Sequence, residues 1–511
     1  MSMTDRMKNY QTEERAEFLN KAESLRPKLI KGTVYPKKIT TDGRERETKL
    51  LLKMRFNKGK SLCLDFGTHC VGYLSFEIKP DGYPPDAPAY LRIKLAERMS
   101  ELEYNSTDYN GALSSGWIQE EYLHVDVMPA LIRLPRRYAF RYVQIYVIDT
   151  SPSYDVRLSG FECETVTSAD MAEVPPVLCR DERLLQIDRI SVKTLSECMQ
   201  DVFEDGPKRD RRLWIGDLRL QALVNYCTFK NYDLVKRCLY LFAGSVLSGG
   251  CVGACMYAEP AAKVGAVKLF DYSLFFISCL YDYYTETKDR ELLNELYPTA
   301  LKQAELAAER LEENYIVRDS GDWWCFLDWN DALNKQAGAQ AVFIYTLKHL
   351  RILTAELGRD CEFIDSMIRQ LSEAAKNSFW DAEQGFFVSG KERQVSWAAQ
   401  VWFVLADILT EKENAELLMR LMKQNPDIRM VTPYMYHYFV EALIKAGMKK
   451  EARRCICEYW GSMADDGADC FFELYDPEDK KLSPYGSAAV NSYCHAWSCT
   501  PAYFIRKFFA E

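Results

Sequence analysis

The chain has 511 residues, of which 48% are hydrophobic and 27% are charged, as in ordinary globular proteins. It carries 74 acidic against 65 basic side chains, a formal net charge of −9. This balance argues against nucleic acid or an anionic membrane as the main partner, because both select basic surfaces. No stretch approaches about 18 uncharged apolar residues, so no membrane span is expected either.

The 17 cysteines are an odd number and form no paired C-x-x-C array. Many lie in apolar runs, where Cys behaves as a small hydrophobe. None of the five histidines is spaced from a pair of cysteines as in the usual zinc sites. The first 31 residues are charged throughout and lack the apolar core of a signal peptide. We therefore expect reduced thiols in a cytoplasmic protein, with no metal and no cofactor.

The first part of the chain has a strand-like pattern. Residues 1–48 are predicted to be an N-terminal extension with one helix near 13–29. From about residue 50 to 167, apolar and polar residues alternate in short runs, separated by turn-forming clusters such as 81–86. The runs are 51–56, 61–66, 71–78, 90–95, 122–127, 138–148 and 156–161. This pattern predicts an antiparallel β-sandwich over residues 49–172.

After residue 176 the period of the apolar residues changes to 3.6, which is typical of helices. The expected helices are 181–203, 217–229, 232–247, 271–287, 291–313, 331–357, 361–379, 395–409, 412–423, 432–446, 449–463 and 496–509. Twelve helices in six antiparallel pairs predict an (α/α)6 barrel, a six-hairpin toroid, over residues 173–511. An α-solenoid is the alternative, but no repeat of fixed period is visible. In such a barrel we expect binding chemistry in the loops at one mouth.

Four segments between the expected helices combine carboxylates with aromatic residues. Residues 204–217 hold four carboxylates, four cations and Trp214, and residues 319–331 hold three Trp and four Asp. Residues 465–476 and 491–497 are the other two. An ion-paired surface loop would explain the charges but not Trp214, and Asp217 would also suit the N-cap of the next helix. Indole faces stack on sugar C–H groups and carboxylates accept from hydroxyls, so this composition suits a sugar site.

Glycoside hydrolysis needs two carboxyl groups that flank the scissile bond, one protonated and one ionised. The loops supply many carboxylates, and the chain has no G-x-S-x-G elbow, no P-loop and no Rossmann glycine fingerprint. Composition therefore favours carbohydrate binding or hydrolysis, without assigning a role to any one residue.

In these loops the chain resembles the bacterial α-L-rhamnosidases of glycoside hydrolase family 78, over about residues 62–509. Their loop has the form Asp-x-Pro-x-Arg-Asp-Glu-Arg-x-x-Trp-x-Gly-Asp, and its end is similar to residues 214–217. An ungapped superposition places Asp210 on the family's Glu, the general acid. The segment 467–473, Gly-Ala-x-x-x-x-Glu, resembles the one that supplies the general base. Residues 431–437 and 494–498 also resemble family segments, and 64–67, 71–73 and 140–143 resemble its β-domain.

The resemblance implies a glycosidase with an inverting mechanism that acts on a small terminal deoxy-sugar or a related glycoside. Asp210 would protonate the glycosidic oxygen, and Glu473 would deprotonate a water on the opposite face of the sugar. The other site residues that it implies share the task of holding the sugar: Asp205, Arg209, Trp214, Asp217, Trp324, Trp329 and His495.

The chain departs from the family pattern in three respects. Asp210 is one methylene shorter than the family's Glu, and Arg209 and Arg211 flank it in sequence. A gapped alignment would place Arg211 on the acid and leave no acid at all. The family's usual C-terminal β-sandwich has no counterpart, which would leave barrel surface exposed. A homodimer could cover that surface, and the oligomeric state is left undecided. The alternatives to an enzyme are therefore a non-catalytic carbohydrate-binding relative, or a structural role for an acidic helical toroid.

Overall fold

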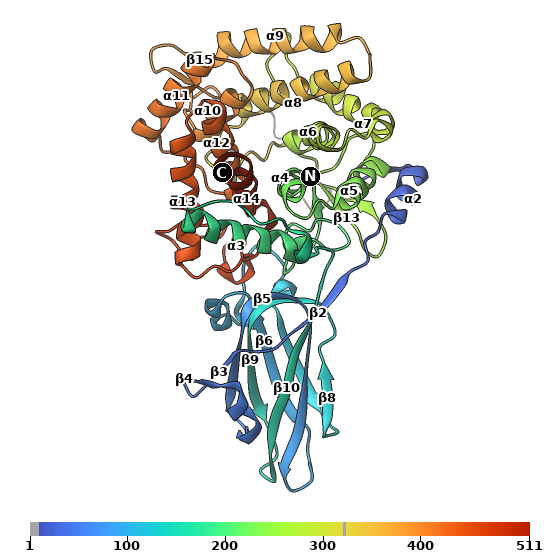
Figure 1. The fold of residues 1–511 in the computed structure, drawn as a ribbon, viewed down its shortest axis with the longest axis vertical. Helices are drawn as coiled ribbons and strands as arrows, with labels where there is room; N and C mark the ends of the chain where they lie inside the picture. The colour runs from blue at the N-terminus through green and yellow to red at the C-terminus, as the bar shows by residue number, and fades with distance from the viewer. Residues whose placement is uncertain (1–9, 320–322, 511) are drawn as a thin grey trace.

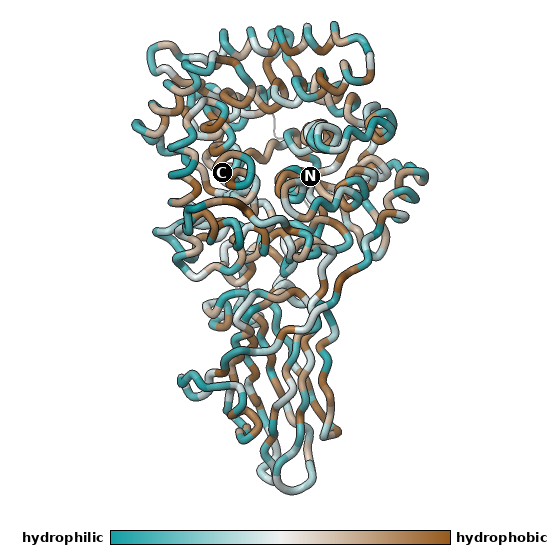
Figure 2. The backbone as a smooth tube through the Cα atoms, in the orientation of Figure 1, coloured by the Kyte–Doolittle hydropathy of each residue, from teal (hydrophilic) through white to brown (hydrophobic). Residues whose placement is uncertain are grey.

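The computed structural model describes residues 10–319 and 323–510. An elongated β-domain lies below a ring of helices (Figure 1). Each part has its own apolar core, and hydrophobic and hydrophilic residues alternate along the long strands of the β-domain (Figure 2). Among the helices of the described residues, none is both long and apolar enough to cross a membrane.

The β-domain is an antiparallel sheet of order β2-β10-β5-β9-β6-β7, in which β3 and β8 also pair with β5, and β4 pairs with β3. The strands are β2 (Ile30–Val34), β3 (Lys38–Thr41), β4 (Arg44–Glu47), β5 (Ser61–Gly82), β6 (Ala89–Ala96), β7 (Glu120–Val125), β8 (Ala130–Arg133), β9 (Tyr138–Asp149) and β10 (Tyr154–Thr167). The first part of β5 pairs with β3 and β9, and its last part pairs with β8 and β10. Strands that change partners in this way build the corner of a sandwich.

Two strand predictions need correction. The runs 61–66 and 71–78 are one continuous strand, β5, because the chain passes through a bulge between Asp65 and Cys70 instead of a turn. Gly67 adopts a positive φ of 75° there, and its N–H donates to the Asp65 carboxylate at 2.7 Å. The sheet also begins earlier than residue 49, since β2, β3 and β4 all come from the predicted N-terminal extension.

The barrel contains a helix in each of the twelve expected segments. The helices are α3 (Glu182–Cys198), α4 (Ile215–Cys227), α5 (Tyr232–Gly244), α6 (Phe270–Thr287), α7 (Arg290–Ala308), α8 (Gln336–Glu356), α9 (Glu362–Phe379), α10 (Trp397–Leu405), α11 (Glu411–Gln424), α12 (Pro433–Lys445), α13 (Lys449–Asp465) and α14 (Pro501–Phe504). The last one is shorter than predicted, because a 3-10 turn precedes Pro501 and a π-helical turn follows Phe504.

The helices form two concentric rings. Helices α4, α6, α8, α10 and α12 each contact the next one, and α14 contacts α4 at the other end of the series. These inner helices are buried on most sides, as in α4, whose residues from Ile215 to Tyr226 are all buried. The outer helices, such as α9 and α11, bury only one face. This arrangement is the predicted (α/α)6 barrel.

The N-terminal segment belongs spatially to the barrel. Strand β1 (Thr12–Glu14) pairs with β12 (Ser245–Leu247), and α2 (Ala16–Ser24) packs on α5. The predicted helix over 13–29 is therefore shorter than expected. From α2 the chain runs down to β2 and enters the β-domain (Figure 1).

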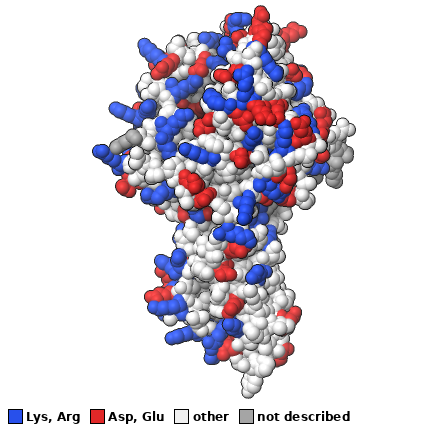
Figure 3. Space-filling view, turned by 45° about the vertical axis from the view of Figure 1, so that its right-hand side comes forward, with Lys and Arg blue, Asp and Glu red and all other residues white. Residues whose placement is uncertain are grey.

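The β-domain supports the loops at the mouth of the barrel. Arg137, just before β9, forms an ion pair with Glu204 at 2.6 Å, and the backbone N–H of Tyr493 donates to Glu97 at 2.6 Å. On the face seen in Figure 3, basic and acidic side chains are interspersed over both domains.

Candidate active site

One cavity at the mouth of the barrel brings together all nine residues that the sequence singled out. Its volume is about 230 Å³, which suits one sugar ring better than a drug-sized ligand. The lining residues are Asp205, Arg209, Asp210, Trp214, Asp217, Val267, Leu269, Tyr272, Trp324, Phe326, Trp329, Glu473, Tyr485, His495 and Trp497. Most of them come from loops that precede or follow the inner helices, as expected for this barrel, while Asp217 and Tyr272 lie in the first turns of α4 and α6. The roles of the nine residues stay predictions.

The loop between α3 and α4 directs four of these side chains into the cavity, namely Asp205, Arg209, Asp210 and Trp214. The Asp205 carboxylate accepts from the backbone N–H of Arg212 at 3.0 Å, and this bond closes the loop. Arg211 has a positive φ of 57° and points away, donating to the carbonyl oxygens of Pro207 and Arg137. Arg211 is therefore not a neighbour of Asp210 in the cavity.

Asp210 lies between two other guanidinium groups. Its carboxylate oxygens are 3.7 Å from Nη1 of Arg209 and 3.8 Å from Nη1 of Arg212. Both distances exceed that of a hydrogen bond. The side chain of Asp210 is 18% exposed, which leaves it open to the cavity.

Asp217 is not the helix cap that its position in the sequence suggested. Helix α4 begins at Ile215, so Asp217 lies inside its first turn and Trp214 occupies the N-cap position without a side-chain cap. Among the described residues, Oδ1 of Asp217 has no hydrogen-bond partner although it is buried. Burial raises the pKa of Asp217 well above its usual value. A buried carboxyl group with a free oxygen suits a ligand hydroxyl.

Glu473 is buried and its carboxylate is fully hydrogen-bonded. Oε2 accepts from Nη2 of Arg209 and from the backbone N–H of Ser492 at 3.1 Å, and Oε1 accepts from the Tyr485 hydroxyl at 2.7 Å. Burial by itself raises the pKa of Glu473, but the charge of Arg209 and these hydrogen bonds outweigh it and hold the pKa below its usual value. Glu473 is therefore ionised at neutral pH.

His495 faces three of the carboxyl groups. Its ring nitrogens lie 3.9 Å from Asp217 and from Glu473, and 4.0 Å from Asp205. Burial lowers the pKa of His495 to about 4, so the ring is neutral at pH 7. Burial, reinforced by the charges of Asp210 and Asp217, raises the pKa of Asp205 well above its usual value. The cavity thus combines carboxyl groups with opposite pKa shifts, a pattern of acid–base sites.

Aromatic side chains form the apolar wall of the cavity. Trp329 lies edge-on to Tyr485 and to Trp497, with ring centroids 5.4 Å apart in both pairs. Trp324 stands at the rim, 44% exposed, with the Lys335 ammonium 3.8 Å from its ring centroid. Trp323, its neighbour in sequence, is buried and does not line this cavity.

Two aspartates hold the Trp-rich loop in place. The Asp271 carboxylate accepts from the N–H groups of Phe326 and Leu327, at 2.9 and 2.8 Å. The Asp328 carboxylate accepts from the N–H of Val431 at 2.7 Å and from Thr432. Asp328 therefore supports the loop, and it does not line this cavity. Residues 320–322 of the predicted cluster lie outside the described residues.

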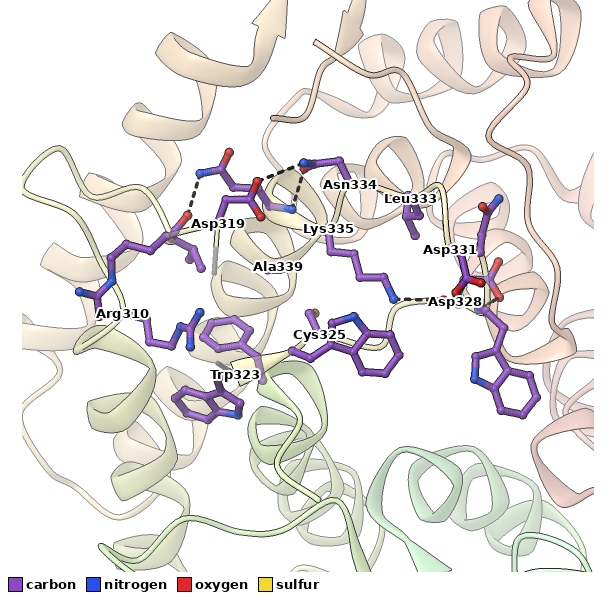
Figure 4. Close-up of a pocket in the computed structure, with 17 residues that line it drawn as sticks. Arg310, Asp319, Trp323, Cys325, Asp328, Asp331, Leu333, Asn334, Lys335 and Ala339 are labelled. Atoms are coloured by element: carbon purple, nitrogen blue, oxygen red, sulfur yellow. Dashed lines mark hydrogen bonds between the residues drawn. The ribbon is translucent and has the colours of Figure 1, made fainter. Parts of the chain in front are cut away.

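A second pocket adjoins the cavity and shares Trp324 and Trp329 with it. In Figure 4, Arg310 and Trp323 lie at one end of this pocket and Asp331 at the other, with Lys335 between them. The Lys335 ammonium donates to the Phe326 carbonyl at 2.7 Å. This hydrogen bond holds the loop segment that separates the second pocket from the cavity.

The sequence missed several lining residues. Tyr485 lies in the short turn Ser483–Gly486 between two of the predicted clusters, and an aromatic residue between Pro and Gly is a signal that could have identified it. Tyr272 gives no signal, because it lies in an apolar run of α6. Trp497 also lines the cavity and donates its indole N–H to the Glu473 carbonyl at 2.8 Å. His437 lies outside the cavity, 3.6 Å from Glu441.

Comparisons with known proteins agree with the sequence resemblance. Residues 36–165 match the glycosyl hydrolase family 78 alpha-rhamnosidase N-terminal domain. Residues 173–508 match the bacterial alpha-L-rhamnosidase six-hairpin glycosidase domain. Together these two models cover most of the chain.

Solved structures and a curated relative that are similar to this chain are also rhamnosidases. A rhamnosidase from Klebsiella oxytoca with rhamnose bound is 44% identical, with a TM-score of 0.94 over 98% of this chain and 100% of that one. A family 78 rhamnosidase of Bacillus sp. GL1 has the same fold at 22% identity and a TM-score of 0.72, over 88% of this chain and 46% of that one. An alpha-L-rhamnosidase of Formosa agariphila is 22% identical over 277 residues, which are 51% of this chain but only 28% of the relative. The chain therefore belongs to glycoside hydrolase family 78, the family of the bacterial α-L-rhamnosidases.

Proposed function

We propose that the protein is an inverting α-L-rhamnosidase that hydrolyses a terminal L-rhamnose, or a closely related deoxy-sugar, from a short glycoside. The observation that carries the proposal is the shared contact of Arg209, whose guanidinium touches both Asp210 and Glu473 beside a cavity of sugar size. The rhamnose bound to the Klebsiella oxytoca relative supports the choice of sugar.

In this proposal Glu473 is the general base. It is ionised at neutral pH and held by Arg209, Tyr485 and the Ser492 N–H, so it can accept a proton from a water without moving. Asp210 is the general acid, since it is partly exposed to the cavity and has no hydrogen bond among the described residues. Inversion requires the carboxyl groups to be about 6.5–9.5 Å apart. Nη1 of Arg209 contacts Asp210 and Nη2 contacts Glu473. Because each carboxyl group meets a different nitrogen of the same guanidinium, the two carboxyl groups are kept several ångströms apart.

The remaining residues would bind the sugar. Asp205 and Asp217 have raised pKa values, and a neutral carboxyl group can both donate to and accept from hydroxyls. The neutral ring of His495 lies between them and offers an unpartnered Nδ1. Trp214, Trp324 and Trp329 would cover the apolar side of the ring.

One observation favours a rival, the non-catalytic carbohydrate-binding relative. Arg209 and Arg212 both lie within 4 Å of Asp210, so this side chain can also serve as an ion-pair partner that holds the loop. The rival predicts that the cavity binds L-rhamnose but that the protein hydrolyses no glycoside.

The deciding experiment measures hydrolysis of aryl α-L-rhamnoside beside β-D-glucoside, α-L-arabinoside and β-D-glucuronide. We expect activity on the rhamnoside with inverted product configuration by NMR. Asp210→Asn and Glu473→Gln should each lower kcat by about 10²–10⁴-fold, the usual share of one acid or base. Asp126→Asn, an exposed carboxylate of the β-domain, is the matched control. An active wild type that kept its rate in both site variants would refute the assignment, and binding without hydrolysis would establish the rival.

A further inference from the structure

A cluster of metal-binding side chains lies directly behind the active site. One ring nitrogen of His69 and the sulfurs of Cys470 and Cys494 lie within 4.8 Å of one another, and all three residues are buried. A third sulfur, that of Cys198, is 4.0 Å from the sulfur of Cys494. All four cysteine and histidine side chains come from different segments: the bulge of β5, the end of α3, and the loops that contain residues 470 and 494.

His69 has the hydrogen-bonding pattern of a metal ligand. Its Nε2 is hydrogen-bonded to the buried carboxylate of Glu97 at 3.0 Å. Its Nδ1 is buried and has no hydrogen-bond partner among the described residues, although Oε2 of Glu197 lies 3.6 Å away. Histidines that bind metals almost always donate the N–H of the other ring nitrogen to a carboxylate, a backbone carbonyl or water, which fixes the orientation of the ring. Nδ1 is therefore the nitrogen available for a metal.

We propose that His69, Cys470 and Cys494, with Cys198 as the fourth ligand, bind one thiophilic divalent cation, Zn²⁺ in the first place. Three thiolates and one imidazole are a common tetrahedral ligand set of structural zinc. With Zn–S bonds of about 2.3 Å, a tetrahedral site places two sulfurs about 3.8 Å apart. The distance of 4.0 Å between Cys198 and Cys494 is already close to this value.

One ammonium group lies beside such a site. Three thiolates exceed the charge of Zn²⁺ by one, and the Lys193 ammonium donates to the His69 carbonyl at 2.9 Å. Lys193 also pairs with Glu197, and the carboxylates of Glu97 and Glu197 each lie beside one ring nitrogen of His69. Metal binding would release the thiol protons, as in other cysteine sites.

The ligands adjoin the active-site residues in the chain. Cys470 precedes Glu473 by three residues, Cys494 precedes His495 directly, and the Cys198 sulfur lies 3.9 Å from the Asp205 carbonyl. His69 comes from the β-domain, so the metal ion would join that domain to the end of α3 and to two active-site loops. Its role is structural, since none of the four ligands lines the cavity. The spacing of the ligands in sequence is too wide for any zinc motif, and only the fold brings them together.

The test measures metal content and does not depend on the glycosidase activity. The full chain is purified with Zn²⁺ in the medium, dialysed against metal-free buffer and analysed for zinc. We expect about one Zn²⁺ per chain for the wild type, since buried structural zinc is bound tightly. The variants Cys494→Ser and His69→Gln should each lose most of it. Cys238→Ser is the matched control, because Cys238 is a buried cysteine in α5 outside the cluster.

A second measurement keeps the proposal testable if these variants do not fold. Wild-type protein loaded with Co²⁺ should show thiolate-to-cobalt charge-transfer absorption, and its thermal midpoint should fall when a strong chelator is added. A wild type that holds no zinc and unfolds at the same temperature with and without chelator would refute the site. A mass two units low, from a disulfide between Cys198 and Cys494, would also refute it.

Discussion

Arg209 and Glu473 form an ion pair in which both side chains are almost completely buried, with exposed fractions of 3% and 2%. Arg209 also donates to the Val490 carbonyl at 2.8 Å, so its position is set by the backbone as well as by the carboxylate. Two buried charges are tolerated only when further hydrogen bonds satisfy them. This pair therefore keeps Glu473 both ionised and immobile beside the cavity.

Tyr485→Phe should weaken this arrangement without removing the ring that lies over Arg209. The variant loses the hydroxyl that donates to Glu473 at 2.7 Å, and a lost hydrogen bond to the ionised form raises the pKa of Glu473. We expect the acid limb of kcat/KM to move to higher pH and kcat to fall by about tenfold. The measurement is the pH–rate profile on the best aryl glycoside. Tyr503→Phe, in α14 and outside the cavity, is the control, and an unmoved acid limb would contradict the prediction.

Trp324→Ala should affect binding more than chemistry. Trp324 forms the exposed rim of the cavity, and a stacked aromatic ring contributes about 0.5–1.5 kcal/mol, or roughly 2–12-fold in affinity. We expect KM to rise within that range while kcat stays within about twofold. Trp117→Ala in the β-domain serves for comparison. A fall in kcat with unchanged KM would place Trp324 at the reacting bond instead.

Gly216→Ala should destabilise the protein through Tyr272. A Cβ atom at Gly216 would lie 2.4 Å from Cζ of the Tyr272 ring, which is buried and cannot easily move. Overpacking of this kind costs about 1–3 kcal/mol. We expect this loss in the free energy of unfolding, together with lower activity, because Tyr272 lines the cavity. A double-mutant cycle with Tyr272→Leu checks the cause: additive losses would show that the two residues do not clash.

His495→Gln should remove part of the acid sensitivity of the fold. The folded pKa of His495 is about 4, below the unfolded value near 6.5, so the unfolded chain binds a proton that the folded protein does not. Stability is therefore full above pH 6.5 and falls as the pH drops to about 4, by about 3 kcal/mol for this residue. Urea unfolding at pH 7.5 and 4.5 should show a smaller difference in the variant. The control is His124→Gln, at an exposed histidine, which should show the wild-type difference. Part of the acid sensitivity should remain in His495→Gln, because burial also lowers the pKa values of His349 and His437.

The sequence was informative where one residue pattern dominates. The change from period two to period 3.6 predicted both domains, because each pattern reports which side of an element is buried. The clusters around Trp214, Trp329 and Glu473 predicted the cavity, since burying carboxylates beside indole rings is costly without a ligand or partner.

The rest depends on contacts between distant residues. Asp217 resembled a helix cap, but α4 begins two residues earlier, and the boundary of a helix is the least certain feature of a sequence pattern. Strand β2 pairs with β10, more than 120 residues later, so no local signal identifies it. The position of Tyr485 depends on its contact with Arg209, and that of His69 depends on the bulge in β5.

The pairing of β1 with β12 also bears on how the chain folds during synthesis. Strand β1 leaves the ribosome early, but its partner follows about 230 residues later. At about 5–20 residues per second, the apolar side of α2 waits on the order of 10–50 s for helix α5. The intervening β-domain can fold in that interval, which would hold the N-terminal segment near the place where the barrel later forms.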